Sequence, residues 1–276
     1  MSKKLLILFL FFPLAVLLSW GDDGHLIIAR YTLQNLPVEI EYFKQWENYI
    51  VKHSIDADIR KFKALTEKPE HYIDIDFYPE FNTGKMITDK NKLIEKYGDS
   101  TVTAHGLLPW ITLENYNNLV TALKEKNRDK VLIFAADLSH YVADGHQPMH
   151  TTLNFDGQLT GQIGIHSRFE VDLVNLHEDE IISSLYSGSG GYVVAALPFI
   201  FNYITESNSY LPLIFAADNY AFEYAGSRVT DDYNKLFWFK TKYLITNRMS
   251  AASKALASLY YSAWVDAGKP NLKEIN

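Results

Sequence analysis

Side chains that could bind a metal ion are concentrated in one segment near the middle of the sequence, residues 137–150 (DLSHYVADGHQPMH). His140 and Asp144 are four residues apart, so a helix places both side chains on one face, about one turn apart. Pro148 interrupts the helix. His150 can therefore approach the same place from non-helical backbone.

A second pair with the same spacing, His166 and Glu170, follows a polar and glycine-containing loop over residues 151–164. Neutral imidazole and carboxylate groups are common ligands of zinc. A solvated polar face of a helix would account for Glu170, but it would not account for the histidines. Two such pairs with a third histidine between them therefore predict a metal site.

Candidate ligands outside this region are few, and each has an alternative interpretation. His25 could bind a metal from the first turn of a helix, or it could be a surface histidine. Asp58 could be a ligand or a solvated acid in a charged turn. His71 could be a ligand whose imidazole is oriented by Asp74 or Asp76, or an ordinary histidine of a strand.

The N-terminal segment has the pattern of a signal peptide, because a positively charged start precedes an apolar run over residues 5–18. This run is shorter than a bilayer span, which takes about 20 residues. Cleavage after residues 1–19 predicts a mature chain of residues 20–276 that is periplasmic or secreted. Its first residue, Trp20, could chelate a metal through its free amino group and its carbonyl oxygen. An uncleaved signal anchor is the alternative.

Composition and periodicity predict a single all-α domain. Hydrophobic residues make up 47% of the chain and it contains no cysteine, so its stability has to come from a large core and not from disulfides. The net charge of −7 argues against a tight grip on a polyanion through basic residues. Alternating residues over 69–82 predict an extended segment. Apolar spacing predicts helices over 24–36, 38–51, 86–97, 109–126 and 129–145, from 166, from about 192, from 212, and over 231–267.

The chain resembles the superfamily of zinc-dependent phospholipases C and S-one/P-one nucleases over nearly all of its predicted mature length. The order and approximate spacing of the candidate ligands carry this resemblance. It implies a mostly helical bundle with three zinc ions at the bottom of a cleft. The matching residues are Trp20 with His25, Ala57 with Asp58, residues 71–74, residues 140–144, residues 147–150, and His166 with Glu170.

The resemblance also implies which side chains hold each ion, with Asp144 shared between two ions. Four histidines, His53, His105, His146 and His177, receive no ligand role. The implied ligands are Asp58, His71, His140 and Asp144 for the first zinc; His150, His166 and Glu170 for the second; and Trp20, His25 and Asp144 for the third.

The two branches of this superfamily share metal-assisted hydrolysis of a phosphodiester, in which a metal-bridging hydroxide attacks phosphorus in line. Asp144 would hold two of the ions, and Asp58 could assist the attacking water. The second ion has only three predicted protein ligands. That leaves a position for water or substrate and favours an enzyme over a non-catalytic zinc-binding protein, whose site would be closed.

The substrate is expected to be a phospholipid, with single-stranded nucleic acid as the alternative. Glu170 and the short loop before His166 resemble the phospholipase C branch. The five-residue step from Trp20 to His25 resembles the single-strand-specific endonucleases. We expect no stable protein partner, and membrane contact only through the substrate.

The first testable prediction concerns Trp20. Only removal of residues 1–19 gives Trp20 a free α-amino group, because in the precursor this nitrogen is an amide and cannot be an ordinary ligand. A protein extended by one residue before Trp20 should therefore fold but lose about tenfold or more of its phosphodiesterase turnover, by analogy with the loss of metal-site groups. Equal turnover of the extended protein, shown by mass to be uncleaved, would contradict this role of Trp20.

Overall fold

The computed structural model describes residues 21–64 and 66–275. Within these ranges the chain consists of helices and loops without a β-strand, so the predicted all-α fold is confirmed. The α-helices are α1 (Gly21–Thr32), α2 (Glu47–His53), α3 (Asp56–Lys61), α4 (Pro79–Asn82), α5 (Lys90–Tyr97), α6 (Asp99–Ala104), α7 (Leu108–Lys124), α8 (Arg128–His146), α9 (Ile165–Ser167), α10 (Leu173–Leu176), α11 (Glu178–Ser184), α12 (Ala196–Ser209), α13 (Leu211–Ala225) and α14 (Asp231–Asp266).

Shorter helical turns connect several of these helices. One of them, η5 (Arg168–Asp172), is a π-helical turn, a rare conformation that is frequent at functional sites. The others are 3₁₀ turns: η1 (Val38–Trp46), η2 (Lys68–His71), η3 (Ile75–Phe77), η4 (Pro148–Thr151) and η6 (Leu272–Glu274).

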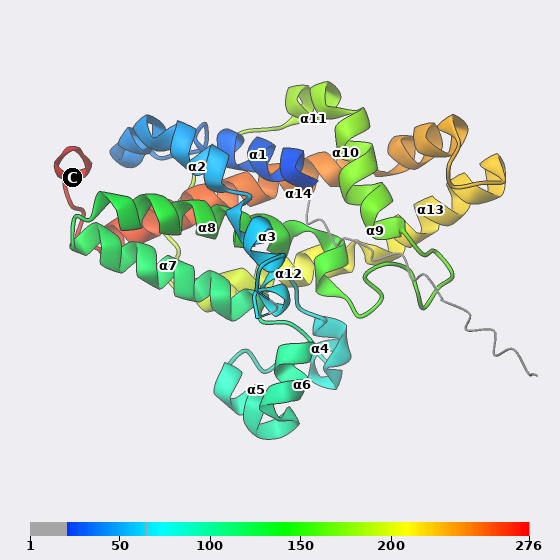
Figure 1. Ribbon diagram of the computed structural model, residues 1–276, viewed down its shortest axis with the longest axis horizontal. Coiled ribbons are helices and arrows are strands. Elements are labelled where there is room, and N and C mark those ends of the chain that lie inside the picture. Colours follow the sequence, from blue (N-terminus) through cyan, green and yellow to red (C-terminus); the bar gives the residue numbers. More distant parts are fainter. Residues whose placement is uncertain (1–20, 65, 276) are drawn as a thin grey trace, which may run out of the picture.

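Helix α8 lies at the centre of the bundle. It packs against α1, α2, α7, α12 and α14, and Figure 1 shows α7 beside it and α14 running along the bundle. The Tyr260 hydroxyl of α14 donates a hydrogen bond to the Ala135 carbonyl of α8, at 2.6 Å. Every residue of α8 from 138 to 146 is buried. The second half of this helix is therefore enclosed by other helices on all sides.

Helix α8 ends where the sequence predicts. The Asn127 side chain accepts a hydrogen bond from the Lys130 amide and caps the start of the helix. At the other end the backbone becomes extended at Gln147, and Pro148 begins η4. Because proline has no amide hydrogen to continue the helix, the chain turns here. His150 is thereby brought back toward the end of α8.

The predicted extended segment over residues 69–82 is wrong. This stretch forms η2, η3 and α4 in succession. Its amides bond to distant parts of the chain instead of to a neighbouring strand: Ile73 donates to the His150 carbonyl at 2.9 Å, and Asp74 donates to the His105 carbonyl at 2.8 Å. The alternation in the sequence therefore does not mark a strand. It belongs to a segment that lies between other loops and bonds to them.

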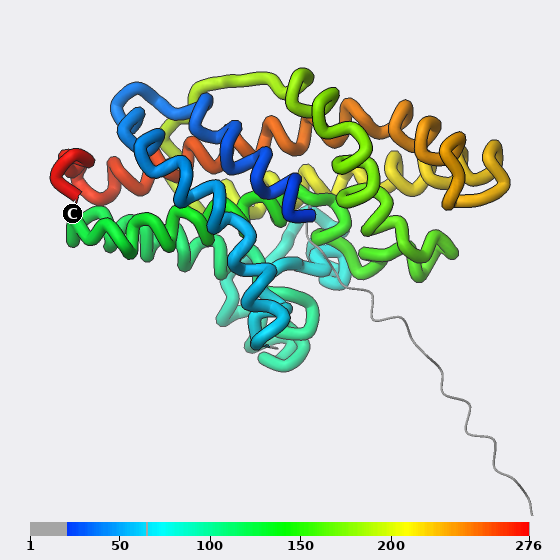
Figure 2. Tube along the Cα trace, turned by 45° about the horizontal axis from the view of Figure 1, so that its top comes forward, coloured from blue at the N-terminus to red at the C-terminus, as the bar shows by residue number. Residues whose placement is uncertain are grey.

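Helices α4, α5 and α6 form a lobe that projects from the bundle (Figures 1 and 2). The indole nitrogen of Trp110 in α7 donates to the Thr88 carbonyl at 2.9 Å and ties this lobe to the bundle. Further along the chain, α12 begins at Ala196, a few residues after the predicted start near 192. In the described ranges, none of the helices has the length and apolar character needed to cross a bilayer.

The second testable prediction concerns the contact between α8 and α12. A Cβ atom at Gly145 would lie 2.5 Å from Cε2 of the buried Tyr203 ring. We expect Gly145→Ala to lower the free energy of unfolding by about 1–3 kcal/mol, because overpacking outweighs the helix propensity of alanine. Urea unfolding followed by circular dichroism measures this change.

Gly191→Ala is the matched control, because nothing lies within 4 Å of a Cβ atom at Gly191. Its free energy of unfolding should stay within about 0.5 kcal/mol of the wild-type value. A Gly145→Ala protein as stable as the control would show that α12 can move away from α8 at little cost.

Candidate metal centre

Eight of the nine predicted ligands come together around the C-terminal end of α8. The ninth, Trp20, lies outside the described residues. None of the eight is more than 6% exposed, so all of them are removed from water. They come from seven elements: α1 (His25), α3 (Asp58), η2 (His71), α8 (His140 and Asp144), η4 (His150), α9 (His166) and η5 (Glu170).

The carboxylate of Asp144 is at the centre of this cluster. Its Oδ2 lies 3.0 Å from Nδ1 of His71 and 3.2 Å from Nε2 of His140. Its Oδ1 lies 3.5 Å from Nε2 of His25 and 3.4 Å from Nδ1 of His150. The two oxygens thus face different histidines, which is the arrangement that a carboxylate shared by two metal ions requires.

Asp58 faces the same histidines from α3. Its Oδ1 lies 3.5 Å from Nδ1 of His71 and 3.8 Å from Nε2 of His140. Its Oδ2 lies 4.0 Å from Nε2 of His25, whose ring stacks on that of His140 with centroids 4.1 Å apart. Asp58, His71 and His140 form one group of potential ligands, and His25, His140 and Asp144 form a second.

Backbone carbonyls fix the orientation of two of the imidazoles. Nδ1 of His140 lies 2.8 Å from the Ser54 carbonyl, and Nδ1 of His150 lies 2.8 Å from the His71 carbonyl. A carbonyl oxygen can only accept, so Nδ1 carries the proton in both rings. Nε2 of each ring is then directed toward the carboxylates. Histidines that bind a metal are held in this way.

The third group of potential ligands consists of His150, His166 and Glu170. Oε2 of Glu170 lies 3.1 Å from Nε2 of His166 and 3.6 Å from Nε2 of His150. The side-chain amide of Gln147 donates a hydrogen bond to the same Glu170 carboxylate. The π-helical turn η5 carries Glu170, and its wider backbone sets where this carboxylate lies relative to His166 on the preceding α9.

Burial and charge adjust the protonation of these groups. Burial lowers the pKa of His71 and His150 well below the usual range, and neighbouring cationic groups lower it further. Both rings are therefore neutral near pH 7, which is the form that binds a metal. Burial also lowers the pKa of His140, but the Asp144 and Asp58 carboxylates outweigh it and raise this pKa to about 9. A metal bound at Nε2 would replace the proton held there.

The donor atoms fit a borderline metal ion such as zinc. Among the described residues, Oε1 of Glu170 and Nε2 of His166 are buried and have no hydrogen-bond partner. Buried polar atoms are almost always paired, so this is a cost that a bound ion would remove. Nitrogen and carboxylate oxygen in groups of three or four are the usual zinc ligands.

A family model described as zinc dependent phospholipase C matches residues 24–264 of the chain, which is most of its length. The protein belongs to the zinc-dependent phospholipase C family. Among curated proteins, no sequence matches the chain. The predicted family is thus confirmed, and zinc is the metal to which the family and the donor atoms both point. The number of three ions and the ligands of each ion stay predictions.

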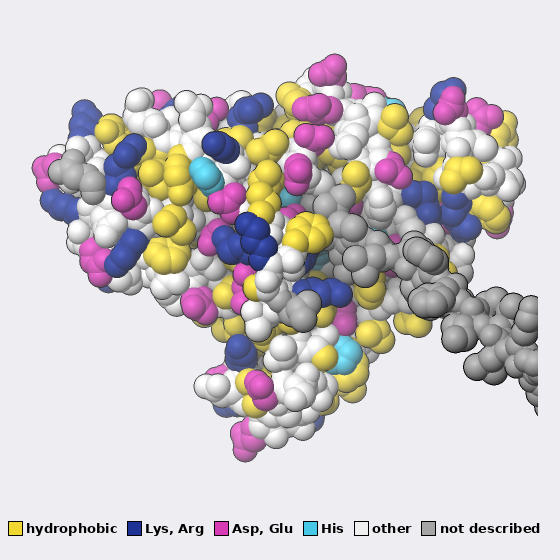
Figure 3. Space-filling view, viewed as in Figure 1, with side chains coloured by type: hydrophobic (Ala, Val, Ile, Leu, Met, Phe, Trp, Pro, Cys, Tyr) yellow, Lys and Arg dark blue, Asp and Glu magenta, His cyan; other side chains and the backbone are white. Residues whose placement is uncertain are grey.

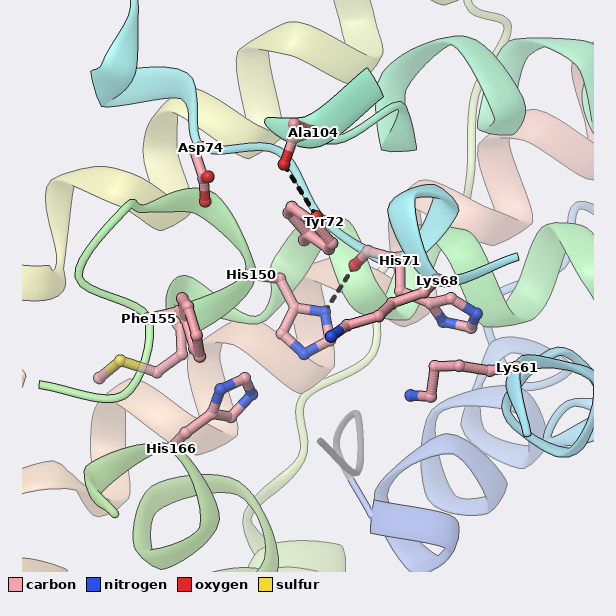
Figure 4. Close-up of a pocket in the computed structure, with 10 residues that line it drawn as sticks. Lys61, Lys68, His71, Tyr72, Asp74, Ala104, His150, Phe155 and His166 are labelled. Carbon is pink, nitrogen blue, oxygen red and sulfur yellow. Dashed lines mark hydrogen bonds between the residues drawn. The ribbon is translucent and has the colours of Figure 1, made fainter. Parts of the chain in front are cut away.

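A cavity of about 160 Å³ opens beside the candidate metal centre of this family member. Figure 4 shows Lys61 and Lys68 on one side of His150, and Phe155 and His166 on the other. The wall therefore combines potential zinc ligands, cationic groups and apolar side chains. The lining residues are Lys61, Lys68, His71, Tyr72, Asp74, Ala104, Met149, His150, Phe155 and His166.

Sequence reasoning missed the two lysines of this cavity. Lys61 is three residues after Asp58 on α3, and its Nζ lies 2.7 Å from Oδ1 of Asp58. This i, i+3 spacing was a signal in the sequence. Lys68 follows a loop, and no local pattern connects it to the ligands. Both ammonium groups give this side of the cavity an affinity for anions.

The predicted role of Asp74 or Asp76 in orienting His71 is wrong. Oδ2 of Asp74 lies 2.9 Å from Nδ1 of His105. Asp76 accepts hydrogen bonds from the Thr152 hydroxyl and the Leu153 amide, which follow η4. Because residues 69–82 turn repeatedly, these carboxylates are directed away from His71. The Asp144 and Asp58 carboxylates face its imidazole instead.

The four histidines without a predicted ligand role lie outside the three groups. His146 is buried and stacks on Tyr203, with centroids 4.3 Å apart. Its Nδ1 bonds to the carbonyl of the preceding turn of α8. His53 and His105 pair with carboxylates, and His177 stacks on an indole ring. Each therefore has a structural partner of its own.

The third testable prediction concerns Asp144. The zinc-loaded protein should contain close to three zinc ions per chain by mass spectrometry. Asp144→Asn should lower this content and reduce turnover of a soluble phosphodiester by about 100-fold or more, because the substitution removes the negative charge that faces four histidines.

Asp129→Asn is the control, since it makes the same chemical change at an exposed position in the first turn of the same helix. Its zinc content and turnover should equal those of the wild type. Wild-type protein with one zinc ion or none would refute the trinuclear assignment. Equal losses in both variants would show that Asp144 is not a ligand.

Proposed function

We propose that this family member is a phospholipase C type hydrolase that cleaves the phosphodiester of a phospholipid into diacylglycerol and a phosphorylated head group. The observation that carries the proposal is the cavity, in which potential zinc ligands form the inner wall and two lysines stand beside them. Such a wall suits a phosphodiester anion, and Met149 and Phe155 suit the apolar neighbours of that anion in a lipid.

Zinc, when bound by these ligands, would lower the pKa of water and neutralise charge on the phosphate oxygens. The protein's own residues would orient the reactants. Asp58 is proposed to accept the proton of the attacking water, because Lys61 engages its Oδ1 and leaves Oδ2 on the side of His25. Asp144 would bind two of the ions and so fix the position of one set of ligands relative to the other.

The lysines would act on the substrate. The Lys61 and Lys68 ammonium groups lie beside the cavity (Figure 4) and would attract the phosphodiester and stabilise its negative charge as the P–O bond to the diacylglycerol breaks. The water oxygen then belongs to the phosphorylated head group, and the diacylglycerol oxygen takes a proton from solvent.

A single-strand-specific endonuclease is the second candidate. The observation in its favour is that two aromatic rings, Tyr72 and Phe155, line the cavity and could stack on a nucleobase. The acidic net charge of the chain favours the lipid, because tight binding of a nucleic acid strand requires many phosphate contacts.

Export is a further part of the proposal. The positively charged start and the apolar run over residues 5–18 support removal of residues 1–19 and a periplasmic or secreted domain over residues 20–276. N-terminal sequencing of the exported protein should then begin at Trp20.

The fourth testable prediction concerns the substrate. Release of diacylglycerol from phosphatidylcholine should exceed release of mononucleotides from single-stranded DNA by about 100-fold or more, because only a matching site stabilises the transition state. Hydrolysis in ¹⁸O-labelled water should place the label in the phosphorylated head group. The opposite ranking of substrates would indicate the endonuclease and leave the zinc ligands unaffected.

A further inference from the structure

Large apolar side chains are exposed on two segments that are far apart in the sequence. Ile59 and Phe62, in and directly after α3, are 45% and 63% exposed. Leu153, Leu159 and Ile163, in the loop between η4 and α9, are 39%, 66% and 70% exposed. We refer to these five residues as the rim.

Each segment of the rim adjoins a residue that lines the same cavity. Phe62 follows Lys61, which lines the cavity from one side. The loop between η4 and α9 contributes Phe155, which lines it from the other side, as Figure 4 shows. The loop also joins two potential ligands, His150 and His166. The opening to the metal centre therefore lies between two apolar segments.

The loop keeps its shape through polar contacts and not through its aliphatic side chains. Asn154 Oδ1 accepts from the Leu159 amide at 2.8 Å, and Asp156 Oδ1 accepts from the Gly164 amide at 3.0 Å. The Gln162 side chain donates to a carboxylate of α13 at 2.8 Å. Leu159 and Ile163 thus have no packing role that would explain them, and their exposure to water is unfavourable.

Cationic side chains accompany the rim. Lys63 is exposed one residue after Phe62, and Lys68 is exposed at the edge of the cavity. Lys61 and Arg60 pair with carboxylates, whereas Lys63 and Lys68 have no such partner among the described residues. Figure 3 shows Lys or Arg and hydrophobic side chains next to each other over α3. The Lys63 and Lys68 ammonium groups are therefore placed to bind an external anion beside the rim.

We propose that the rim, together with Lys63 and Lys68, is a docking surface for a phospholipid bilayer that carries anionic lipid. The aliphatic side chains would enter the interface while the ammonium groups bind lipid phosphates. The opening of the cavity would then face the head groups. This inference rests on the proposed function, and it goes further than membrane contact through the substrate alone, which would need no such surface.

The test compares binding to vesicles with turnover of a substrate that is not in a membrane. Zinc-loaded full-length mature protein is sedimented with vesicles of phosphatidylcholine and phosphatidylglycerol, during a contact too short for measurable hydrolysis. The double variant Leu159→Ser/Ile163→Ser should partition about 100-fold less, because each aliphatic side chain contributes roughly a factor of ten when buried. Turnover of short-chain phosphatidylcholine below its micelle concentration should stay at the wild-type value.

Val38→Ser/Val194→Ser is the matched control. These valines are 77% and 88% exposed on other parts of the surface, and their double variant should bind vesicles as the wild type does. Lys63→Gln should weaken binding about fivefold to anionic vesicles and leave binding to pure phosphatidylcholine unchanged, as loss of one surface cation requires.

Vesicle binding and monomer turnover give separate answers. Wild-type vesicle binding by Leu159→Ser/Ile163→Ser, or an equal loss in the valine control, would overturn the docking surface and leave the proposed function intact. Absence of turnover on monomeric phosphatidylcholine would overturn the proposed function. A selective loss of vesicle binding in the rim variant supports the docking surface in either case.

Discussion

The structure depends on the compensation of buried charge at the end of α8. The Asp144 carboxylate is fully buried, and its two oxygens lie within 3.5 Å of four imidazoles. An ionised carboxylate in such a place costs several kcal/mol unless opposite charge accompanies it. Burial raises the pKa of Asp144 to about 6, which expresses this cost. Bound zinc would replace the proton that His140 holds beside this carboxylate and add positive charge, so that metal binding and folding are coupled.

A frame of hydrogen bonds holds the elements that deliver these side chains. Arg60 on α3 donates to Asp137 on α8 at 3.0 Å, and the Tyr141 hydroxyl donates to Glu67 at 2.9 Å. These contacts bind α3 and the segment before η2 to the outer side of α8. The carbonyls that orient His140 and His150 belong to Ser54, which precedes α3, and to His71, at the end of η2. Ligand geometry is therefore set by the backbone and its polar contacts, and less by the freedom of each side chain.

The cavity has a division of chemistry that matches an amphiphilic substrate. Imidazole, carboxylate and ammonium groups line the cavity together with Met149 and Phe155, and the rim residues are exposed on the segments next to it. An anionic group would be drawn inward by the metal centre and the lysines. Acyl chains would have no polar partner there and would stay outside. With the proposed substrate, the lipid phosphate would reach the metal centre while the acyl chains stay in the bilayer.

The sequence by itself determined those features of the site and the fold that depend on local backbone geometry. The four-residue spacing of His140 with Asp144 and of His166 with Glu170 places each pair on one face of a helical segment, and the structure brings both pairs together. The break at Pro148 and the long helix predicted over 231–267 follow from local pattern as well, and the structure has that helix at Asp231–Asp266.

Only the tertiary structure decided the surroundings of His71. The Ile73 and Asp74 amides, in the short non-helical stretch between η2 and η3, bond to the carbonyls of residues 150 and 105, which are distant in the sequence. That path directs Asp74 toward His105 and leaves His71 to the carboxylates of two other elements. The placement of Lys68 beside the cavity has the same origin. Helical periodicity specifies which residues of one element share a face, whereas the meeting of separate elements depends on packing and on hydrogen bonds that no local pattern records.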